Sequence, residues 1–256
     1  MIRVTAASQL RPLRFSMTTT RPAELPDVPA ESFYLPDIPQ KHPDDMTSVK
    51  YLHEPGQTHH LSQYLGNRDT TLVTGERYIV PGPAYVAGES RYPDLLVAFD
   101  VDPAAYNASN GYIVSEQGKP PDFVLEVASR RTASDDLEGK KDYCERIGVG
   151  EYWLFDGEGQ FYEFTLRGYR LAGDRYEPIP VAEISPGVFQ GYSPALNLNL
   201  RAADAYLGWH DPRTEDHIPT LTSETARADA EHAARLREAA RVQELEAELR
   251  RLRESR

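Results

Sequence analysis

The sequence predicts an α/β protein with a mixed β-sheet core, flanked by helices and followed by a C-terminal helix. The runs LLVAFDV (95–101) and FVLEVAS (123–129) hold apolar residues at consecutive positions, which is typical of strands buried on both faces. A helical segment follows the second run and leads to a third strand, EYWLFD (151–156). This order of strand, strand, helix and strand predicts a mixed sheet covered by helices.

Before this core, residues 1–49 predict an irregular or disordered N-terminal extension, because their later part is rich in proline and acid. The domain itself is predicted over residues 50–208. It begins with a short helix in THHLSQYLGN that ends near Gly66. A hairpin around Gly75 and Glu76 is expected next.

The helix after FVLEVAS is predicted to begin near Ser134 or Asp135, either of which can cap it, and to end near Ile147 before Gly148. Asp135 and Glu138 have the spacing of a capping box. After the third strand, FYEFTL and RGYRLAG predict a hairpin near Gly168.

Beyond the core, residues 209–222 predict a linker and residues 223–256 a charged C-terminal helix. The apolar residues of this helix keep a 3–4 spacing for about one and a half heptads, at Val242, Leu245, Leu249 and Leu252. Leu236 falls out of this register, so any coiled coil is short or interrupted. The helix is expected to bind a second copy of the chain or another protein.

The formal net charge of −12 is concentrated in the middle of the chain. Residues 1–21 contain four arginines and no acid, and residues 224–256 hold equal numbers of acids and arginines. An acidic body argues against tight non-specific binding to phosphate backbones, although a bound cation would invert the local field. No window approaches the roughly 18 to 20 apolar residues of a membrane span, so no membrane contact is expected.

Few other residues of the chain are candidates for a disulfide, a metal site or a cofactor site. Cys144 is the single cysteine, which excludes an intrachain disulfide and favours a reducing, cytoplasmic setting; it is expected to be a small core residue. His59 and His60 are adjacent and point to different faces, so no joint metal site is expected. The sequence has no glycine-rich phosphate-binding motif, and no nucleotide cofactor is expected.

Two acids, Asp94 and Glu126, stand at strand positions where a carboxylate is costly. Asp94 immediately precedes LLVAFDV, and Glu126 lies in the middle of FVLEV. An unpaired buried carboxylate costs several kcal/mol, so each should contact a cation, a metal ion or several donors. If the two strands are neighbours, both carboxylates meet at one end of the sheet.

Lys140 is the cation that the following helix offers to these acids. At about 100° per residue it falls inside the apolar stripe of that helix, whereas Lys141 falls at its edge. A helix that packs this stripe on the sheet aims Lys140 at the two carboxylates. Such a cluster suits Mg²⁺ bound through oxygen ligands, with a lysine beside it. A structural ion network accounts for the same three residues equally well.

The runs RYPDLLVAFDV and PDFVLEVASRRTASDDLEGKKDYCERIGVGEYWLFD resemble the Uma-two family of endonucleases, within the PD-(D/E)XK restriction-endonuclease-like superfamily. The resemblance covers roughly residues 50–200. It rests on an ordered set of residues: Pro93-Asp94, Glu126, Ser129, Asp136, Lys140, Gly148-Val149 and Glu151-Tyr152-Trp153.

The resemblance implies a restriction-endonuclease-like fold and metal-dependent hydrolysis of nucleic-acid phosphodiesters, with DNA as the expected substrate. It also implies that Asp94, Glu126 and the Val127 carbonyl bind Mg²⁺ or Mn²⁺. Lys140 corresponds to the catalytic lysine that, in this family, comes from the following helix. Asp94, Glu126 and Lys140 are therefore the expected catalytic residues.

The sequence departs from the superfamily pattern at one point. The usual lysine two residues after the acid is replaced by Ala128, so the chemistry depends on Lys140 reaching the site across space. For the first-helix acid that often joins such sites, Glu54 is the candidate. The main alternative is a non-catalytic assembly or DNA-associated module, in which the same acids and lysine form a structural network.

Overall fold

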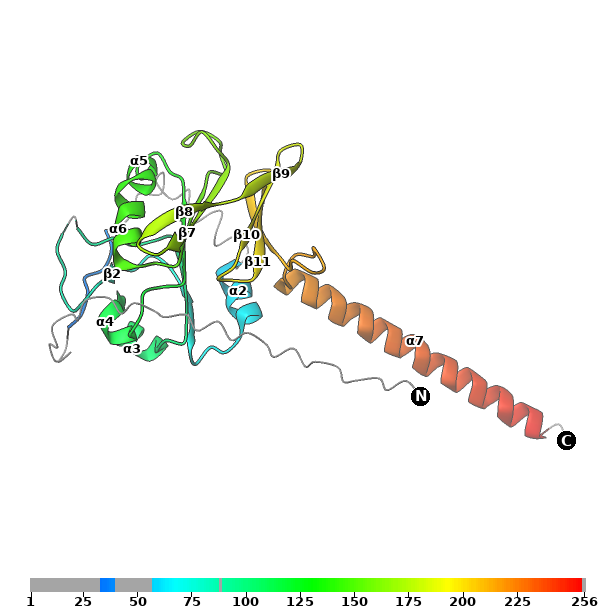
Figure 1. Ribbon diagram of the computed structural model, residues 1–256. Coiled ribbons are helices and arrows are strands. Elements are labelled where there is room, and N and C mark those ends of the chain that lie inside the picture. Colours follow the sequence, from blue (N-terminus) through cyan, green and yellow to red (C-terminus); the bar gives the residue numbers. More distant parts are fainter. Residues whose placement is uncertain (1–32, 40–56, 88, 255–256) are drawn as a thin grey trace, which may run out of the picture.

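The structure is a computed structural model, and it describes residues 33–39, 57–87 and 89–254. Its centre is a six-stranded mixed sheet with strand order β1-β3-β5-β6-β7-β8 (Figure 1). These strands are β1 (Thr71–Thr74), β3 (Leu95–Phe99), β5 (Phe123–Val127), β6 (Glu151–Phe155), β7 (Leu166–Ala172) and β8 (Arg175–Ile179). The β5–β6 pair is parallel and the other neighbours are antiparallel.

Strands β5 and β6 occupy the middle of this sheet, and all of their residues are buried. Successive side chains of a strand point to opposite faces. Phe123, Leu125 and Val127 therefore join one apolar cluster, while Val124 joins another on the opposite face. The same alternation places Glu126 on the face of Val124, which is the face covered by helices.

Helices and one small sheet cover that face (Figure 1). Their bounds are α3 (Pro103–Ala108), α4 (Val114–Gln117), α5 (Ala133–Leu137), α6 (Gly139–Ile147), β2 (Ile79–Val80) and β4 (Tyr112–Ile113). Strands β2 and β4 pair in parallel. In α6, Tyr143 and Cys144 are buried in the apolar cluster beneath the helix, which fixes the side that α6 presents to the sheet.

A second sheet, which the sequence analysis did not predict, covers the other face together with α2 (Gln57–Leu65). It is antiparallel, with order β12-β11-β10-β9. Its strands are β9 (Val181–Ser185), β10 (Val188–Ser193), β11 (Leu198–Ala203) and β12 (Tyr206–His210). Trp153 of the large sheet packs in one cluster with Leu200 and Trp209 of the second sheet. Only Pro180 separates β8 from β9.

The predicted class, a mixed sheet flanked by helices with a C-terminal helix, is confirmed. So is the short helix ending near Gly66, since α2 ends at Leu65. The hairpin around Gly75 and Glu76 is wrong, because β1 pairs with β3 and β2 pairs with β4. Gly75 is small for a packing reason: a Cβ there would lie 2.0 Å from the carbonyl oxygen of Asp94.

The hairpin predicted near Gly168 is also wrong, because Gly168 lies inside the continuous strand β7. A Cβ at Gly168 would lie 2.8 Å from three atoms of the Trp153 ring. The turn between β7 and β8 comes at Gly173, whose φ is +67°. At Gly168 the glycine therefore marks a close packing contact in a strand, not a turn.

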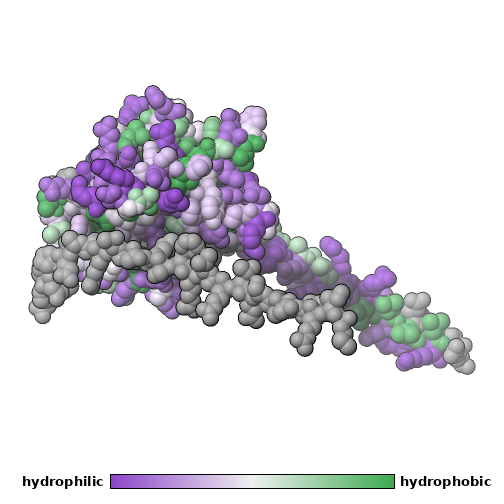
Figure 2. All heavy atoms as spheres, in the orientation of Figure 1, coloured by the Kyte–Doolittle hydropathy of each residue, from purple (hydrophilic) through white to green (hydrophobic). Residues whose placement is uncertain are grey.

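The C-terminal helix α7 (Leu221–Glu254) has 34 residues, a length of about 50 Å, and projects from the body (Figure 1). Apolar side chains appear on its distal half (Figure 2). Within residues 33–39 of the predicted N-terminal extension, Leu35 is buried against Tyr78 and Ile113; the other residues of 1–49 lie outside the described part. No helix among the described residues is long and apolar enough to cross a membrane.

Candidate active site

Asp94 and Glu126 come together because their strands are neighbours. Strand β3 pairs antiparallel with β5, with Leu95 opposite Leu125, so the register continues to Asp94 opposite Glu126. One carboxylate oxygen of Asp94, Oδ2, accepts a hydrogen bond of 2.8 Å from the backbone N–H of Val127. The expected meeting of the two acids at one end of the sheet is therefore present.

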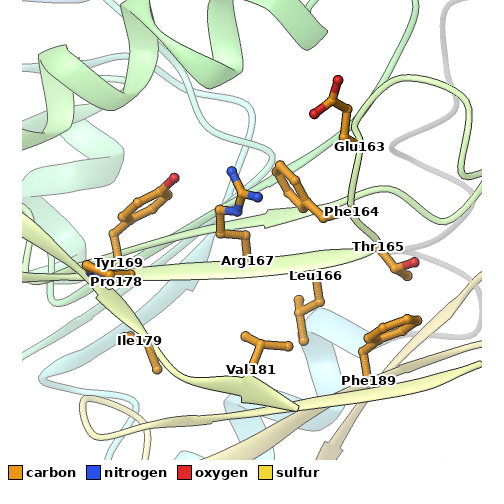
Figure 3. Close-up of a pocket in the computed structure, with 10 residues that line it drawn as sticks. All are labelled: Glu163, Phe164, Thr165, Leu166, Arg167, Tyr169, Pro178, Ile179, Val181 and Phe189. Atoms are coloured by element: carbon orange, nitrogen blue, oxygen red, sulfur yellow. The ribbon is translucent and has the colours of Figure 1, made fainter. Parts of the chain in front are cut away.

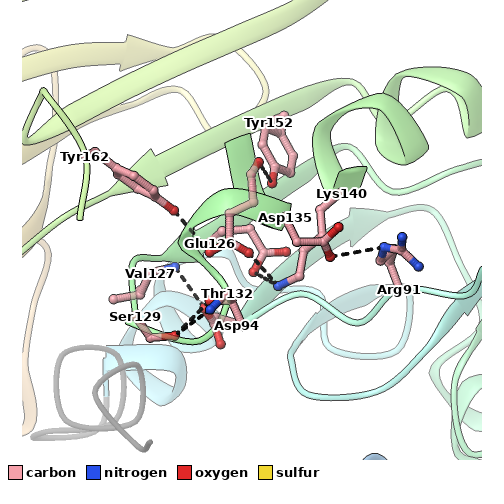
Figure 4. Close-up of polar contacts among 11 residues, drawn as sticks. Arg91, Asp94, Glu126, Val127, Ser129, Thr132, Asp135, Lys140, Tyr152 and Tyr162 are labelled. Carbon is pink, nitrogen blue, oxygen red and sulfur yellow. Dashed lines mark hydrogen bonds and ion pairs between the residues drawn. The ribbon is translucent and has the colours of Figure 1, made fainter. Parts of the chain in front are cut away.

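Lys140 reaches this pair from the first turn of α6 (Figure 4). Its Nζ lies 2.6 Å from Glu126 Oε2 and 2.8 Å from Asp136 Oδ1. Lys141 points elsewhere, with its ammonium 5.1 Å from the centre of the Tyr169 ring. The choice of Lys140 over Lys141 as the inward lysine is confirmed.

The helix that carries Lys140 is not continuous. Helix α5 begins at Ala133, so neither Ser134 nor Asp135 caps it, and the chain breaks at Glu138, with φ −124° and ψ −75°. A Cβ at Gly139 would lie 2.1 Å from Asp135 Oδ1, so glycine permits this close turn. Lys140 still faces the sheet as expected, because Lys140, Cys144 and Ile147 all belong to α6.

Asp136 is a third carboxylate of the site, which the sequence analysis left out of the catalytic set. It is fully buried, and its Oδ2 accepts a hydrogen bond of 3.1 Å from the Tyr162 hydroxyl. Its backbone carbonyl accepts a second hydrogen bond, from the Tyr152 hydroxyl at 2.8 Å. The available signal was its position four residues before Lys140, where helical side chains are neighbours.

Tyr162 is held in place by Asp156, which ends the β6 segment. The Asp156 carboxylate accepts hydrogen bonds from four backbone N–H groups, those of Glu158, Gly159, Phe161 and Tyr162. These bonds hold residues 156–162 in a loop that places the Tyr162 hydroxyl within hydrogen-bonding distance of Asp136. No local sequence pattern predicts this contact.

Asp94, Glu126, Asp136 and Lys140 are 9, 1, 0 and 6% exposed. Two of these carboxylates, those of Glu126 and Asp136, pair with the Lys140 ammonium, and all four groups are largely buried. Burial raises the pKa of Glu126 well above its ordinary value, and the charges of Asp136 and Asp94 raise it further against the opposing effect of Lys140. Burial also raises the pKa of Asp136.

Burial acts on the pKa of Lys140 in the opposite direction. Desolvation by itself lowers its pKa, but the charges of Glu126, Asp136 and Asp94 outweigh that effect and raise the pKa well above its ordinary value. Lys140 is therefore an ammonium at neutral pH. It can stabilise negative charge, and it is a poor base for removing a proton from water.

The donors of the cluster can be compared with what a divalent cation requires. Among the described residues, no three His, Cys, Asp or Glu side chains are arranged to hold a metal ion. The set expected from the sequence is of another kind: the Asp94 and Glu126 carboxylates with the backbone carbonyl of Val127. Mg²⁺ is commonly held by one or two carboxylates and keeps several waters. The donor chemistry and the excess of buried negative charge fit such an ion.

The other candidate residues lie outside this cluster. His59 contacts Gln63, and the Nε2 of His60 accepts a hydrogen bond from the backbone N–H of Leu221. Cys144 is buried in the helix-side core, and burial raises the pKa of its thiol, consistent with the structural role expected of it. Glu54 lies outside the described residues.

A further buried carboxylate, Glu151, serves the packing of the two sheets. It accepts hydrogen bonds from Trp153 Nε1 (2.9 Å), Ser193 Oγ (2.6 Å) and the Ala195 backbone N–H (2.7 Å). It lies on the face of the large sheet opposite Glu126, because it shares its side with Trp153. Glu151 therefore links β6 to the second sheet and is not part of the candidate site.

Comparison with known proteins agrees with the resemblance seen in the sequence. The Uma2 family model, described as "Putative restriction endonuclease", matches residues 45–200. Among solved structures, the chain is similar to one described as a "putative nuclease belonging to DUF820 from Anabaena variabilis ATCC 29413". The two are 16% identical with a TM-score of 0.36, and the match covers 58% of this chain and 75% of the other. No curated protein matches. Because the family model spans more than half of its residues, the chain belongs to the Uma2 family of restriction-endonuclease-like proteins.

Proposed function

We propose that the protein is a metal-dependent endonuclease that hydrolyses phosphodiester bonds of nucleic acid, DNA being the expected substrate. The observation that carries the proposal is the buried cluster in which the Lys140 ammonium pairs with Glu126 and Asp136, next to the buried carboxylate of Asp94. Such an excess of buried negative charge is costly unless a cation or a proton offsets it. Perturbed ionisable groups of this kind gather at functional sites.

In this proposal, Asp94, Glu126 and the Val127 carbonyl would hold Mg²⁺ or Mn²⁺. When bound, such an ion polarises a phosphoryl oxygen and lowers the pKa of a bound water. The Val127 N–H holds the Asp94 carboxylate in place, and Lys140 holds Glu126. Asp136 and Tyr162 in turn orient Lys140, so the site is supported by a second layer of hydrogen bonds.

Lys140 has a defined electrostatic role. Because its neighbours keep it protonated, it would stabilise the negative charge that develops on the phosphate, an effect that is strong where water is excluded. Arg130 and Arg131 are exposed just after β5 and add positive charge at the end of that strand.

A non-catalytic role for the same fold is favoured by one observation. Lys140 is already paired with two carboxylates, and Asp136 with the Tyr162 hydroxyl. A closed network of this kind can serve folding alone, as an assembly or DNA-associated module would require.

Plasmid nicking separates the two functions. The wild-type protein and the variants Asp94→Asn, Glu126→Gln and Lys140→Met are incubated with supercoiled DNA in Mg²⁺, in Mn²⁺ and in EDTA. Metal-dependent nicking that all three substitutions abolish supports the endonuclease. Nicking that persists in all three variants would show that these residues do not form the active site. A wild-type protein that binds no metal by calorimetry would favour the non-catalytic module. Circular dichroism confirms that each variant is folded.

The C-terminal helix is proposed to pair with the same helix of a second copy. Val242, Leu245, Leu249 and Leu252 are each about half exposed. With Val242 and Leu245 at positions a and d, Arg241 takes position g and Glu246 position e, which face each other across a parallel pair. Sedimentation should show a dimer that Leu245→Glu dissociates, whereas Ala247→Glu, outside the seam, leaves it intact.

A further inference from the structure

A pocket of about 690 Å³ opens beside the candidate active site, where β7 and β8 meet the second sheet. Phe164, Arg167 and Tyr169 lie on one side of β7, and Val181 and Phe189 on the other (Figure 3). The volume falls in the range of about 300 to 1,000 Å³ that is usual for small-molecule sites. The proposed nuclease chemistry uses none of these residues.

The pocket contains a stacked cation–aromatic pair. The central carbon of the Arg167 guanidinium lies over the Phe164 ring, 3.7 Å from its centre. Aromatic rings and guanidinium planes are the surfaces on which unpaired nucleobases stack. Glu163, exposed at the same wall, offers an acceptor for an exocyclic amino group of a base.

The side of the pocket formed by Phe164 and Arg167 shares one face of the large sheet with the carboxylate cluster. Glu126 is paired with Leu154, and Leu154 with Arg167, so Arg167 lies in register with Glu126 two strands away. Two inter-strand spacings amount to about 10 Å. The Phe164 ring also stacks on Tyr162 with a centroid distance of 5.1 Å, and Tyr162 contacts Asp136. The pocket therefore lies next to the Tyr162 side of the cluster.

We infer that this pocket binds an unpaired nucleobase beside the scissile phosphate, so that the substrate is single-stranded or locally unpaired nucleic acid. The inference rests on the proposed endonuclease function and names the substrate class for that site. A base inside a duplex cannot lie against the exposed Arg167 guanidinium without first leaving its stack. Unpaired bases carry no such cost.

The charge of the chain points to the same substrate. A protein with a net charge of −12 gains little affinity from phosphate backbones, whose binding depends on released counterions. Stacking supplies affinity that does not depend on that release. The stacking part of single-strand binding should therefore be less sensitive to salt than the part that comes from phosphate contacts.

The test measures fluorescence anisotropy of a short fluorescein-labelled single strand and of the same sequence as a duplex, in EDTA to prevent cleavage. We expect the wild-type protein to bind the single strand more tightly than the duplex. Phe164→Ala and Arg167→Ala should each weaken single-strand binding by at least about fivefold. Phe164→Leu, which keeps the apolar bulk without the ring, should weaken it as well and guards against misfolding of the alanine variant.

Arg170→Ala is the matched control, because it removes the same charge from the opposite face of β7. If Arg170→Ala weakens single-strand binding as much as Arg167→Ala does, the effect comes from the loss of positive charge alone, and the inference is overturned. Unchanged affinity in the Phe164 and Arg167 variants, or tighter binding of the duplex, would also overturn it. If the wild-type protein still nicks DNA in Mg²⁺ or Mn²⁺, the endonuclease proposal stands in those cases. A wild-type protein that neither binds nor cuts nucleic acid removes both proposals.

Discussion

Lys140 Nζ lies 2.6 Å from Glu126 Oε2, in a contact that is nearly sealed from water. The two residues belong to β5 and α6, on the helix-covered face of the sheet. The same ammonium contacts Asp136 at 2.8 Å. Removing Lys140 takes the shared cation from both buried carboxylates, so the effects of the three residues on stability and on chemistry are coupled.

Replacing Lys140 by methionine should lower the free energy of unfolding by about 3–5 kcal/mol, because Glu126 and Asp136 lose their shared cation inside the protein. Urea denaturation at neutral pH measures the change. Lys141→Met is the matched control, since Lys141 lies over the Tyr169 ring and its loss should cost about 1 kcal/mol at most. Equal losses in the two variants would contradict the buried pairing.

The stability of the protein should depend on the ionisation of Glu126. Burial raises the pKa of this carboxyl above the 4.5 of a free glutamate, so between these two pKa values the folded state holds a proton that the unfolded state has lost. The stabilisation from this proton is complete below about pH 4.5 and disappears as the pH rises through the folded-state pKa.

The free energy of unfolding of the wild type should therefore fall relative to that of Glu126→Gln as the pH rises from 4.5, by up to about 1.4 kcal/mol per pH unit. Urea denaturation of both proteins across pH 5–8 gives the difference, in which the other titrating groups largely cancel. A difference that stays flat, or that rises with pH, contradicts the raised pKa.

Mg²⁺ or Mn²⁺ should stabilise the folded protein, because an ion that binds the native state alone shifts the unfolding equilibrium. An ion at one hundred times its dissociation constant adds about 2.7 kcal/mol. Thermal melts with and without the ion measure this gain, and EDTA should reverse it.

Asp94→Asn should abolish the stabilisation by metal. Asp100→Asn is the control, since Asp100 is exposed at the opposite end of β3, and asparagine tolerates its φ of +56°. A gain that persists in Asp94→Asn would show that the ion binds elsewhere.

Asp156→Asn should disturb the candidate site from a distance. The Asp156 carboxylate accepts bonds from four backbone N–H groups, among them that of Tyr162, and an amide nitrogen cannot accept them. We expect a loss of about 1.5–3 kcal/mol and faster amide hydrogen exchange over residues 158–162. Glu158→Gln on the exposed part of the same loop should change neither quantity. Unaltered exchange in Asp156→Asn would show that the loop is held by other contacts.

Gly168→Ala tests the close packing of β7 against the Trp153 ring of β6. The added methyl group would lie 2.8 Å from three atoms of that ring, and overpacking of this kind costs about 1–3 kcal/mol. At Gly82 the nearest atom to an added Cβ is 3.8 Å away, so Gly82→Ala should be nearly neutral in the same thermal melt. Equal melting temperatures for the two variants would contradict the close contact at Trp153.

The sequence by itself determined the central strands and the residues that meet at their end. Strands buried on both faces are visible as continuous apolar runs, so β3 and β5 could be predicted, and a charged residue within or beside such a run stands out. The facing of Lys140 could be predicted as well, because Lys140, Cys144 and Ile147 lie on one helix with a regular period.

Only the tertiary structure decided what surrounds these residues. The break at Glu138 turns α5 so that Asp136 points inward, and the Asp156 loop brings Tyr162 to it from 26 residues away. The second sheet and the close packing at Gly168 likewise depend on contacts between distant segments. Local periodicity indicates which face of an element is buried, but it does not indicate which distant side chain packs against that face. For that reason the acids and the lysine could be predicted from the sequence, whereas their supporting hydrogen bonds could not.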